Sequence, residues 1–110
     1  MAKLLDTSYL IAYHNKDDKN HQRAREIEVE NRVINDYIYT EVIDILYSRR
    51  GKDKANEYGK FLNKSTKMVR VSTPIFRKAV QNFKDKDISF TDASIAATAQ
   101  KLDMKLVSFD

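Results

Sequence analysis

The 110-residue sequence contains no cysteine and no tryptophan, and it has only one proline and two glycines. Without cysteine the chain forms no disulfide and offers no thiolate metal ligand, which fits a reducing compartment such as the cytoplasm. No apolar run approaches the roughly 18 residues that a membrane-spanning helix needs. Asp6 comes too early for the apolar core of a signal peptide. We therefore expect a cytoplasmic protein with no membrane segment.

The remaining composition is typical of a folded, basic protein. Hydrophobic residues make up 42% and charged residues 33% of the chain, and its length suits one domain over residues 1–110. The 20 Lys and Arg outnumber the 16 Asp and Glu, which gives a net charge of +4. A basic surface favours a polyanion such as nucleic acid as the partner, although many proteins are basic without binding one.

Strand and helix signals alternate along the chain, which predicts an α/β fold with a short, mostly parallel sheet. The expected strands cover residues 2–6, 32–35, 68–71 and 105–109. The expected helices cover residues 9–14, 18–30, 37–50, 52–64, 73–83 and 89–102. We find no internal repeat, low-complexity tract or linker.

Four acidic residues fall where this pattern would gather them: Asp6, Glu41, Asp92 and Asp110. Asp6 and Asp110 each close an apolar run, so they would lie at the carboxyl edge of the parallel sheet, where open α/β folds place their chemistry. Two carboxylates ~4 Å apart repel by about 4 kcal/mol at an effective dielectric near 20, so such a cluster needs a cation. The sequence therefore predicts an oxygen-lined site for Mg²⁺ or Mn²⁺.

Each acid also has an ordinary structural explanation. Asp6 is a good helix-capping residue, and Asp92 would be favoured by the dipole of the helix that it begins. Glu41 borders the apolar stripe of its helix, where a carboxylate needs either a metal or a basic partner. His14 and His21 lie in or beside polar segments, and we expect them to be exposed rather than catalytic.

Over essentially all 110 residues the chain resembles PIN domains, specifically the small prokaryotic VapC-type toxins. The motifs that carry the resemblance are Leu5–Leu10 (LDTSYL), Tyr39–Val42 (YTEV), Phe90–Ala97 (FTDASIAA) and Val107–Asp110 (VSFD). Each motif is short, and it is their order and spacing together that make the resemblance specific.

The resemblance implies a three-layer α/β/α fold and a metal-dependent endoribonuclease that acts as the toxin of a type II toxin–antitoxin pair. RNA, a small antitoxin and a second copy of the chain in a homodimer are the implied partners. Family members usually continue past the last acid with a further edge strand, so we expect that strand to be missing here. The residues that match the family's site are the catalytic and metal-binding acids Asp6, Glu41, Asp92 and Asp110, with Ser8 and Thr91 in support.

Two other functions compete with this interpretation. A PIN-like module without catalysis would hold RNA or a protein through Arg49, Arg50 and Lys52, although cations at this helix end also complement its dipole. A phosphotransferase would use Asp6 as its nucleophile. Haloacid-dehalogenase-like phosphatases have a second Asp two residues later, where this chain has Ser8, and the sequence has no glycine-rich phosphate loop.

Overall fold

The structure of the protein, a computed structural model, describes residues 2–109. Its strands form one four-stranded sheet in the order β3-β2-β1-β4, and every neighbouring pair is parallel. The predicted parallel α/β fold is therefore confirmed. The strands are β1 (Ala2–Leu5), β2 (Asn31–Asn35), β3 (Lys67–Val69) and β4 (Lys105–Val107).

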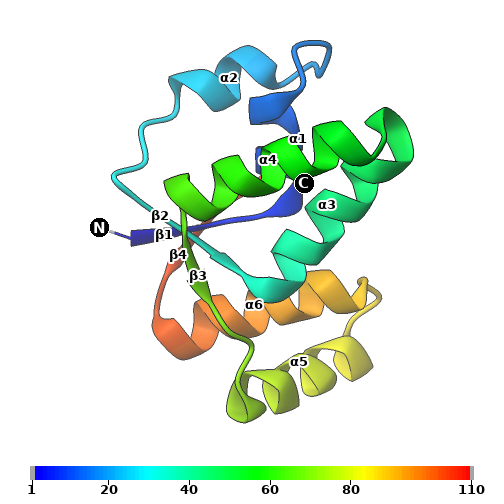
Figure 1. The fold of residues 1–110 in the computed structure, drawn as a ribbon. Helices are drawn as coiled ribbons and strands as arrows, with labels where there is room; N and C mark the ends of the chain where they lie inside the picture. The colour runs from blue at the N-terminus through cyan, green and yellow to red at the C-terminus, as the bar shows by residue number, and fades with distance from the viewer. Residues whose placement is uncertain (1, 110) are drawn as a thin grey trace.

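Six helices connect and cover these strands: α1 (Thr7–His14), α2 (His21–Glu26), α3 (Asp36–Arg50), α4 (Lys52–Ser65), α5 (Thr73–Asp85) and α6 (Phe90–Leu102). The β1–β2 and β2–β3 connections step in one direction and the β3–β4 connection steps back. Right-handed crossovers therefore place α5 and α6 on the face opposite the other helices, and Figure 1 shows this pair below the strands. Among residues 2–109, no helix has the length and apolarity needed to cross a membrane.

The main core lies where the two central strands meet α1, α3 and α4. Strand residues Leu4, Leu5 and Ile34 have no exposed surface, and they pack against side chains such as Ile38 and Leu62 from the helices. Full burial of each such side chain contributes about 1.5–3 kcal/mol. A smaller cluster joins α5 to α6 through Ile75, Ala79, Ala93 and Ala97. Its alanines bring the two helices close together, which fixes the start of α6.

Most boundaries lie within two residues of the prediction, and three differences are instructive. The helix expected over residues 18–30 is reduced to α2, because Ile27 is already extended (φ −73°, ψ 119°) and both Ile27 and Val29 pack against the main core. The first helix begins earlier than expected, because Asp6 caps it. The last strand ends at Val107 rather than at residue 109.

Candidate functional site

Asp6 follows β1 and caps α1, so its structural explanation is correct in part. Its Oδ1 accepts hydrogen bonds from the Tyr9 backbone N–H at 3.0 Å and from the Ser8 hydroxyl at 2.7 Å. The side chain is only 4% exposed, yet within residues 2–109 its Oδ2 receives no hydrogen bond and the carboxylate has no ion pair. One oxygen of a largely buried carboxylate is thus left for a ligand.

Asp6, Glu41 and Asp92 line one cavity of about 500 Å³ at the carboxyl edge of the sheet. They come from the end of β1, from α3 and from the first turn of α6, which are far apart in the sequence. Asp6 is buried, Glu41 is half-buried beside the apolar stripe of α3, and Asp92 is exposed. We call this space the acidic cavity. The turn before α2 also contributes to it through Asp18, Lys19 and Asn20, which the sequence analysis did not single out.

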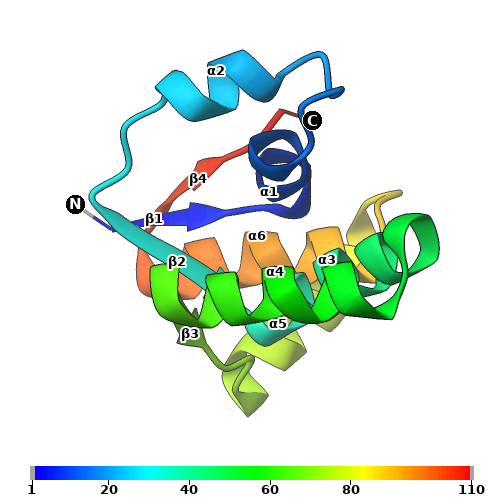
Figure 2. The ribbon, with the colours of Figure 1, turned by 45° about the horizontal axis from the view of Figure 1, so that its top comes forward.

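Ser8 links Asp6 to the end of the chain. Its hydroxyl donates to Asp6 and accepts a hydrogen bond from the Phe109 backbone N–H at 2.9 Å. The Asp6 N–H also donates to the Val107 carbonyl at 3.2 Å. In Figure 2 the segment after β4 accordingly runs to α1. Asp110 follows directly in the sequence, but it lies outside the described residues.

The start of α6 is organised by a serine cap. The Ser89 hydroxyl accepts a hydrogen bond from the Asp92 N–H at 3.0 Å, which fixes the backbone of Asp92. Thr91 does not line the acidic cavity; it lines an adjoining groove of about 620 Å³ that shares Glu41 and Arg49 with it. The Thr91 carbonyl accepts a hydrogen bond from the Ser94 hydroxyl at 2.7 Å. Its own role in support of the acids stays a prediction.

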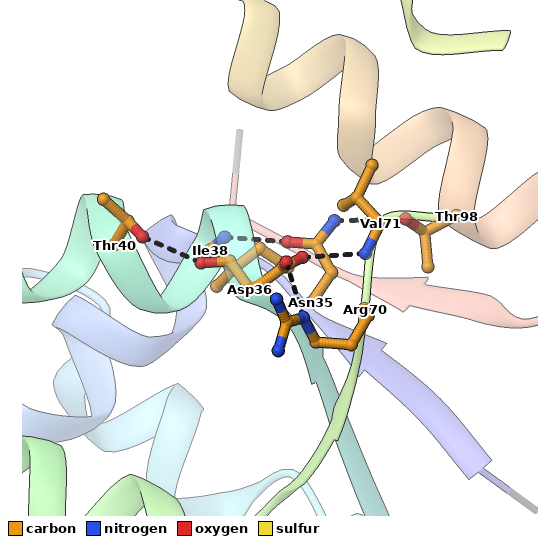
Figure 3. A network of polar contacts seen from close by, with 7 residues as sticks. All are labelled: Asn35, Asp36, Ile38, Thr40, Arg70, Val71 and Thr98. Carbon is orange, nitrogen blue, oxygen red and sulfur yellow. Dashed lines mark hydrogen bonds and ion pairs between the residues drawn. The ribbon is translucent and has the colours of Figure 1, made fainter. Parts of the chain in front are cut away.

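Asn35 is a positioning residue that the sequence analysis missed. It is wholly buried at the junction of β2 and α3, where its Oδ1 accepts from the Ile38 N–H at 2.7 Å. Its Nδ2 donates to the hydroxyl of Thr98 at 3.1 Å (Figure 3). It also donates to the hydroxyl of Ser94 at 3.4 Å, and both partners are on α6. Asn35 therefore ties the helix that carries Glu41 to the helix that carries Asp92. An asparagine before a helix indicates a cap, but its partners 59 and 63 residues away leave no sequence signal.

The three cations proposed for RNA binding have different surroundings. Arg49 lines the acidic cavity and the adjoining groove, whereas Arg50 lines a different cavity beside α1 and α4. The Lys52 ammonium lies 5.3 Å from the centre of the Tyr47 ring. Arg49 is thus the cation placed to meet a ligand of the acids.

Neither histidine lines the acidic cavity, but the expectation that both are exposed is wrong. His14 is half-buried with its ring centre 4.3 Å from that of Tyr58, and burial together with the nearby Arg50 charge lowers the pKa of His14. His21 is also half-buried, and its Nδ1 lies 2.7 Å from the Ala12 carbonyl. Burial raises the pKa of Tyr9, whose hydroxyl donates to the Ala24 carbonyl.

The donors of the acidic cavity fit a hard divalent cation in their chemistry. Its carboxylates and hydroxyls offer oxygen ligands, and within residues 2–109 the buried Thr7 hydroxyl in the same cavity has no hydrogen-bond partner. However, no three acidic or histidine side chains between residues 2 and 109 are grouped closely enough to hold a metal. A complete set of metal ligands would therefore need Asp110, movement of the exposed Asp92 and the half-buried Glu41, or both.

Several solved structures share this fold over the whole chain. VapC20 of Mycobacterium tuberculosis, a toxin that cleaves the sarcin–ricin loop, is 20% identical with a TM-score of 0.86, covering 100% of this chain and 90% of that one. VapBC2 of Rickettsia felis, bound to a promoter DNA fragment, is 14% identical with a TM-score of 0.79, covering 100% and 88%. VapBC-1 of nontypeable Haemophilus influenzae is 18% identical with a TM-score of 0.72, covering 100% and 87%. At these identities the likeness establishes the fold.

No curated protein matches this sequence. The PIN domain family model, in contrast, matches residues 3–110, which is nearly the whole chain. The match spans the motifs that contain Asp6, Glu41 and Asp92 together with the sheet that positions them. The chain therefore belongs to the PIN domain family.

Proposed function

We propose that this PIN domain is a Mg²⁺- or Mn²⁺-dependent endoribonuclease, the toxin of a type II toxin–antitoxin pair. The observation that carries the proposal is the acidic cavity, where Asp6, Glu41 and Asp92 meet from three separate elements at the carboxyl edge of the sheet. Asp110 is the proposed fourth ligand.

In this proposal the four acids hold the cation and keep it at the edge of the sheet. When bound, a divalent cation activates water for attack on phosphorus and neutralises charge on the phosphoryl oxygens. Ser8 holds the Asp6 carboxylate, and Thr91 supports the start of α6. Arg49 is placed to pair with a phosphate of the substrate, because it lines both the acidic cavity and the adjoining groove.

The charge distribution supports RNA as the substrate. Without the four acids of the site, the other 12 Asp and Glu face 20 Lys and Arg, an excess of 8 positive charges. A basic body around an acidic, cation-binding cavity attracts a polyanion and still admits the metal. The adjoining groove contains Tyr37, which gives a flat ring near the path of the strand.

We also propose a small antitoxin and a homodimer as partners, all in the cytoplasm. A toxin–antitoxin complex from Klebsiella pneumoniae has the same fold, with a TM-score of 0.74, which supports the antitoxin. For the dimer contact we propose the outer face of α5, where Phe76, Val80 and Phe83 are 42%, 45% and 48% exposed. Phe90 extends this apolar patch, with ring centres 5.7 Å from Phe76 and 5.6 Å from Phe83. Sedimentation of wild type and Phe83→Glu tests the contact, since only a dimer through this face dissociates in the variant.

The nuclease is tested with purified protein and end-labelled single-stranded RNA. We expect cleavage with Mg²⁺ or Mn²⁺, none in EDTA, and recovery when the metal is added back. Asp92→Asn should abolish cleavage, while the matched control Asp103→Asn should not. Asp103 is an exposed helix-capping residue with φ +51°, a conformation that asparagine adopts readily. Cleavage that persists in EDTA and in Asp92→Asn would remove the metal-site proposal.

The second candidate is a PIN-like module that binds RNA or protein without catalysis. It is favoured by the spacing of the acids, since residues 2–109 contain no complete metal-binding group. RNA binding that survives EDTA, combined with no cleavage under Mg²⁺ or Mn²⁺, would support this function instead of the nuclease.

A further inference from the structure

A second cavity, of about 620 Å³, lies beside the carboxyl end of α1 and combines aromatic rings with cations. We propose that this aromatic–basic cavity anchors single-stranded RNA: a base stacks against the exposed ring of Phe61, while Arg25, Arg50 and Lys54 bind the adjacent phosphates. The inference rests on the proposed function, since it assigns a second contact to the same substrate.

The aromatic side of the cavity is a row of three rings. Tyr58 lies between the other two, with its ring centre 4.3 Å from His14 and 5.6 Å from Phe61, nearly parallel to Phe61 at 16°. Tyr58 is buried, and its hydroxyl donates to the Leu10 carbonyl at 3.1 Å, which anchors the row to α1. Phe61, at the outer end, is 40% exposed. A rigid row with an open outer ring is a platform on which any base can stack.

The basic side of the cavity is partly preorganised. The Arg25 guanidinium lies 4.2 Å from the centre of the Tyr13 ring, and its Nε donates to the Tyr13 carbonyl at 3.2 Å. This holds the group in place and leaves its terminal nitrogens for a phosphate. Lys54 lies 3.8 Å from Glu57 in an exposed pair, which costs little to open.

Charge alone would also admit an acidic protein segment. Lining the cavity are four bases, Lys16, Arg25, Arg50 and Lys54, and two acids, Asp17 and Glu57. The ring row favours RNA over an acidic peptide, because carboxylate side chains have no flat apolar surface to cover it. Burial and the Arg50 charge lower the pKa of His14, which favours the neutral form of the ring that packs against Tyr58.

The two cavities are close enough for one RNA strand. Arg49 lines the acidic cavity and its neighbour Arg50 lines the aromatic–basic cavity. On α1, Ile11 lines the acidic cavity and His14 lines the aromatic–basic cavity. These two residues are about 4.5 Å apart along the helix axis, at 1.5 Å per residue. A strand held at Phe61 therefore passes the acids within a few nucleotides.

The test is fluorescence anisotropy of 5′-labelled oligouridylate with the full chain in EDTA, which separates binding from cleavage. Phe61→Ala should weaken binding about tenfold, the lower part of the range for loss of one stacked base, and Phe61→Trp should bind as wild type. Arg50→Gln should reduce the slope of log affinity against log salt by about 0.7, the value for one phosphate contact on a single strand. The matched controls are Leu102→Ala, also 40% exposed, and the exposed Arg77→Gln, which should bind as wild type.

Two results would overturn this inference. The first is unchanged RNA binding and salt dependence in both Phe61→Ala and Arg50→Gln. The second is weakened binding of labelled octaglutamate in these variants without any change in RNA binding, which would assign the cavity to an acidic protein segment. Both results are independent of whether Mg²⁺ supports RNA cleavage, so failure of this inference is distinct from failure of the proposed nuclease.

Discussion

Two neighbouring strands of the sheet are each followed directly by an aspartate, and the surroundings of the two aspartates differ. After β2, Asp36 has both oxygens occupied: Oδ1 accepts from the Val71 N–H at 2.9 Å and Oδ2 from the Arg70 Nε–H at 3.1 Å (Figure 3). After β1, Asp6 uses Oδ1 to cap α1, and within residues 2–109 its Oδ2 has no hydrogen bond. Arg70 and the Val71 N–H therefore balance the charge of Asp36, whereas the charge of Asp6 has no cationic partner within residues 2–109. An acid at a strand end is thus a functional candidate only when its partners are missing.

The largest expected effect is the difference between the asparagine variants of these two aspartates. Asp6→Asn should lower RNA cleavage by about 100-fold or more, because the site loses a charged group that acts at the reacting centre. Its melting temperature should stay close to wild type, since asparagine caps a helix about as well as aspartate. Asp36→Asn should leave kcat unchanged. A larger loss of kcat in Asp36→Asn than in Asp6→Asn would reverse the two assignments.

Asn35→Ala tests whether the junction after β2 also positions the site. We expect a loss of about 2 kcal/mol in the free energy of unfolding, since the variant loses the cap of α3 and its buried bonds to α6. Urea titration measures this loss. RNA cleavage should fall further than the folded fraction does, because α3 and α6 lose the bonds that fix the position of Glu41 relative to Asp92. The local control is Thr40→Ala, which removes an exposed hydrogen bond to the Asp36 carbonyl. An equal loss of stability in both variants would mean that Asn35 does not stabilise the junction more than its neighbours do.

Ser8→Ala tests whether the hydrogen bond from Ser8 is what orients the Asp6 carboxylate. The variant keeps the cap from Asp6 to Tyr9 and removes the hydroxyl that joins Asp6 to Phe109. We expect cleavage to fall about tenfold, as for other groups that orient a metal ligand, with a proportionally higher metal concentration for half-maximal rate. Titration with Mn²⁺ measures both values. An unchanged metal requirement would mean that Ser8 only ties the strand end to α1.

The smallest effect is expected for Arg70→Gln. The Arg70 side chain is 82% exposed, so its ion pair with Asp36 contributes about 0.5 kcal/mol or less to stability. The Val71 backbone bond to Asp36 remains. Denaturation at low and at high salt should therefore give a difference in unfolding free energy between variant and wild type that is close to zero. A loss above about 1 kcal/mol at either salt concentration would show that the ion pair has a larger structural role.

The order of strands and helices could be predicted from the sequence, because local patterns determine it. The apolar stripe of α3 placed Glu41 at the border of the core, and the structure finds it half-buried there. The extent of α2 could not be predicted in this way. Ile27 fits a helical pattern locally, but contact with the main core draws it into an extended segment.

The distinction between Asp6 and Asp36 also lay beyond the sequence. Each of these residues is an acid at a strand–helix junction, and the partners of Asp36 are 34 and 35 residues away. The role of Gly59 also depends on a contact that is distant in the sequence. Locally it only weakens a helix, but in the structure an added Cβ would lie 2.6 Å from the Tyr39 hydroxyl oxygen. Its value comes from the close approach of α3 and α4.

The bond between Ser8 and Phe109 has a consequence for the order of events in folding. Strand β1 is central in the sheet, and its neighbour β4 follows the other three strands in the sequence. Asp6 is therefore not held in its final setting until β4 and the segment after it have packed beside β1 and α1. The acidic cavity takes its final form only when these two distant segments are both in place.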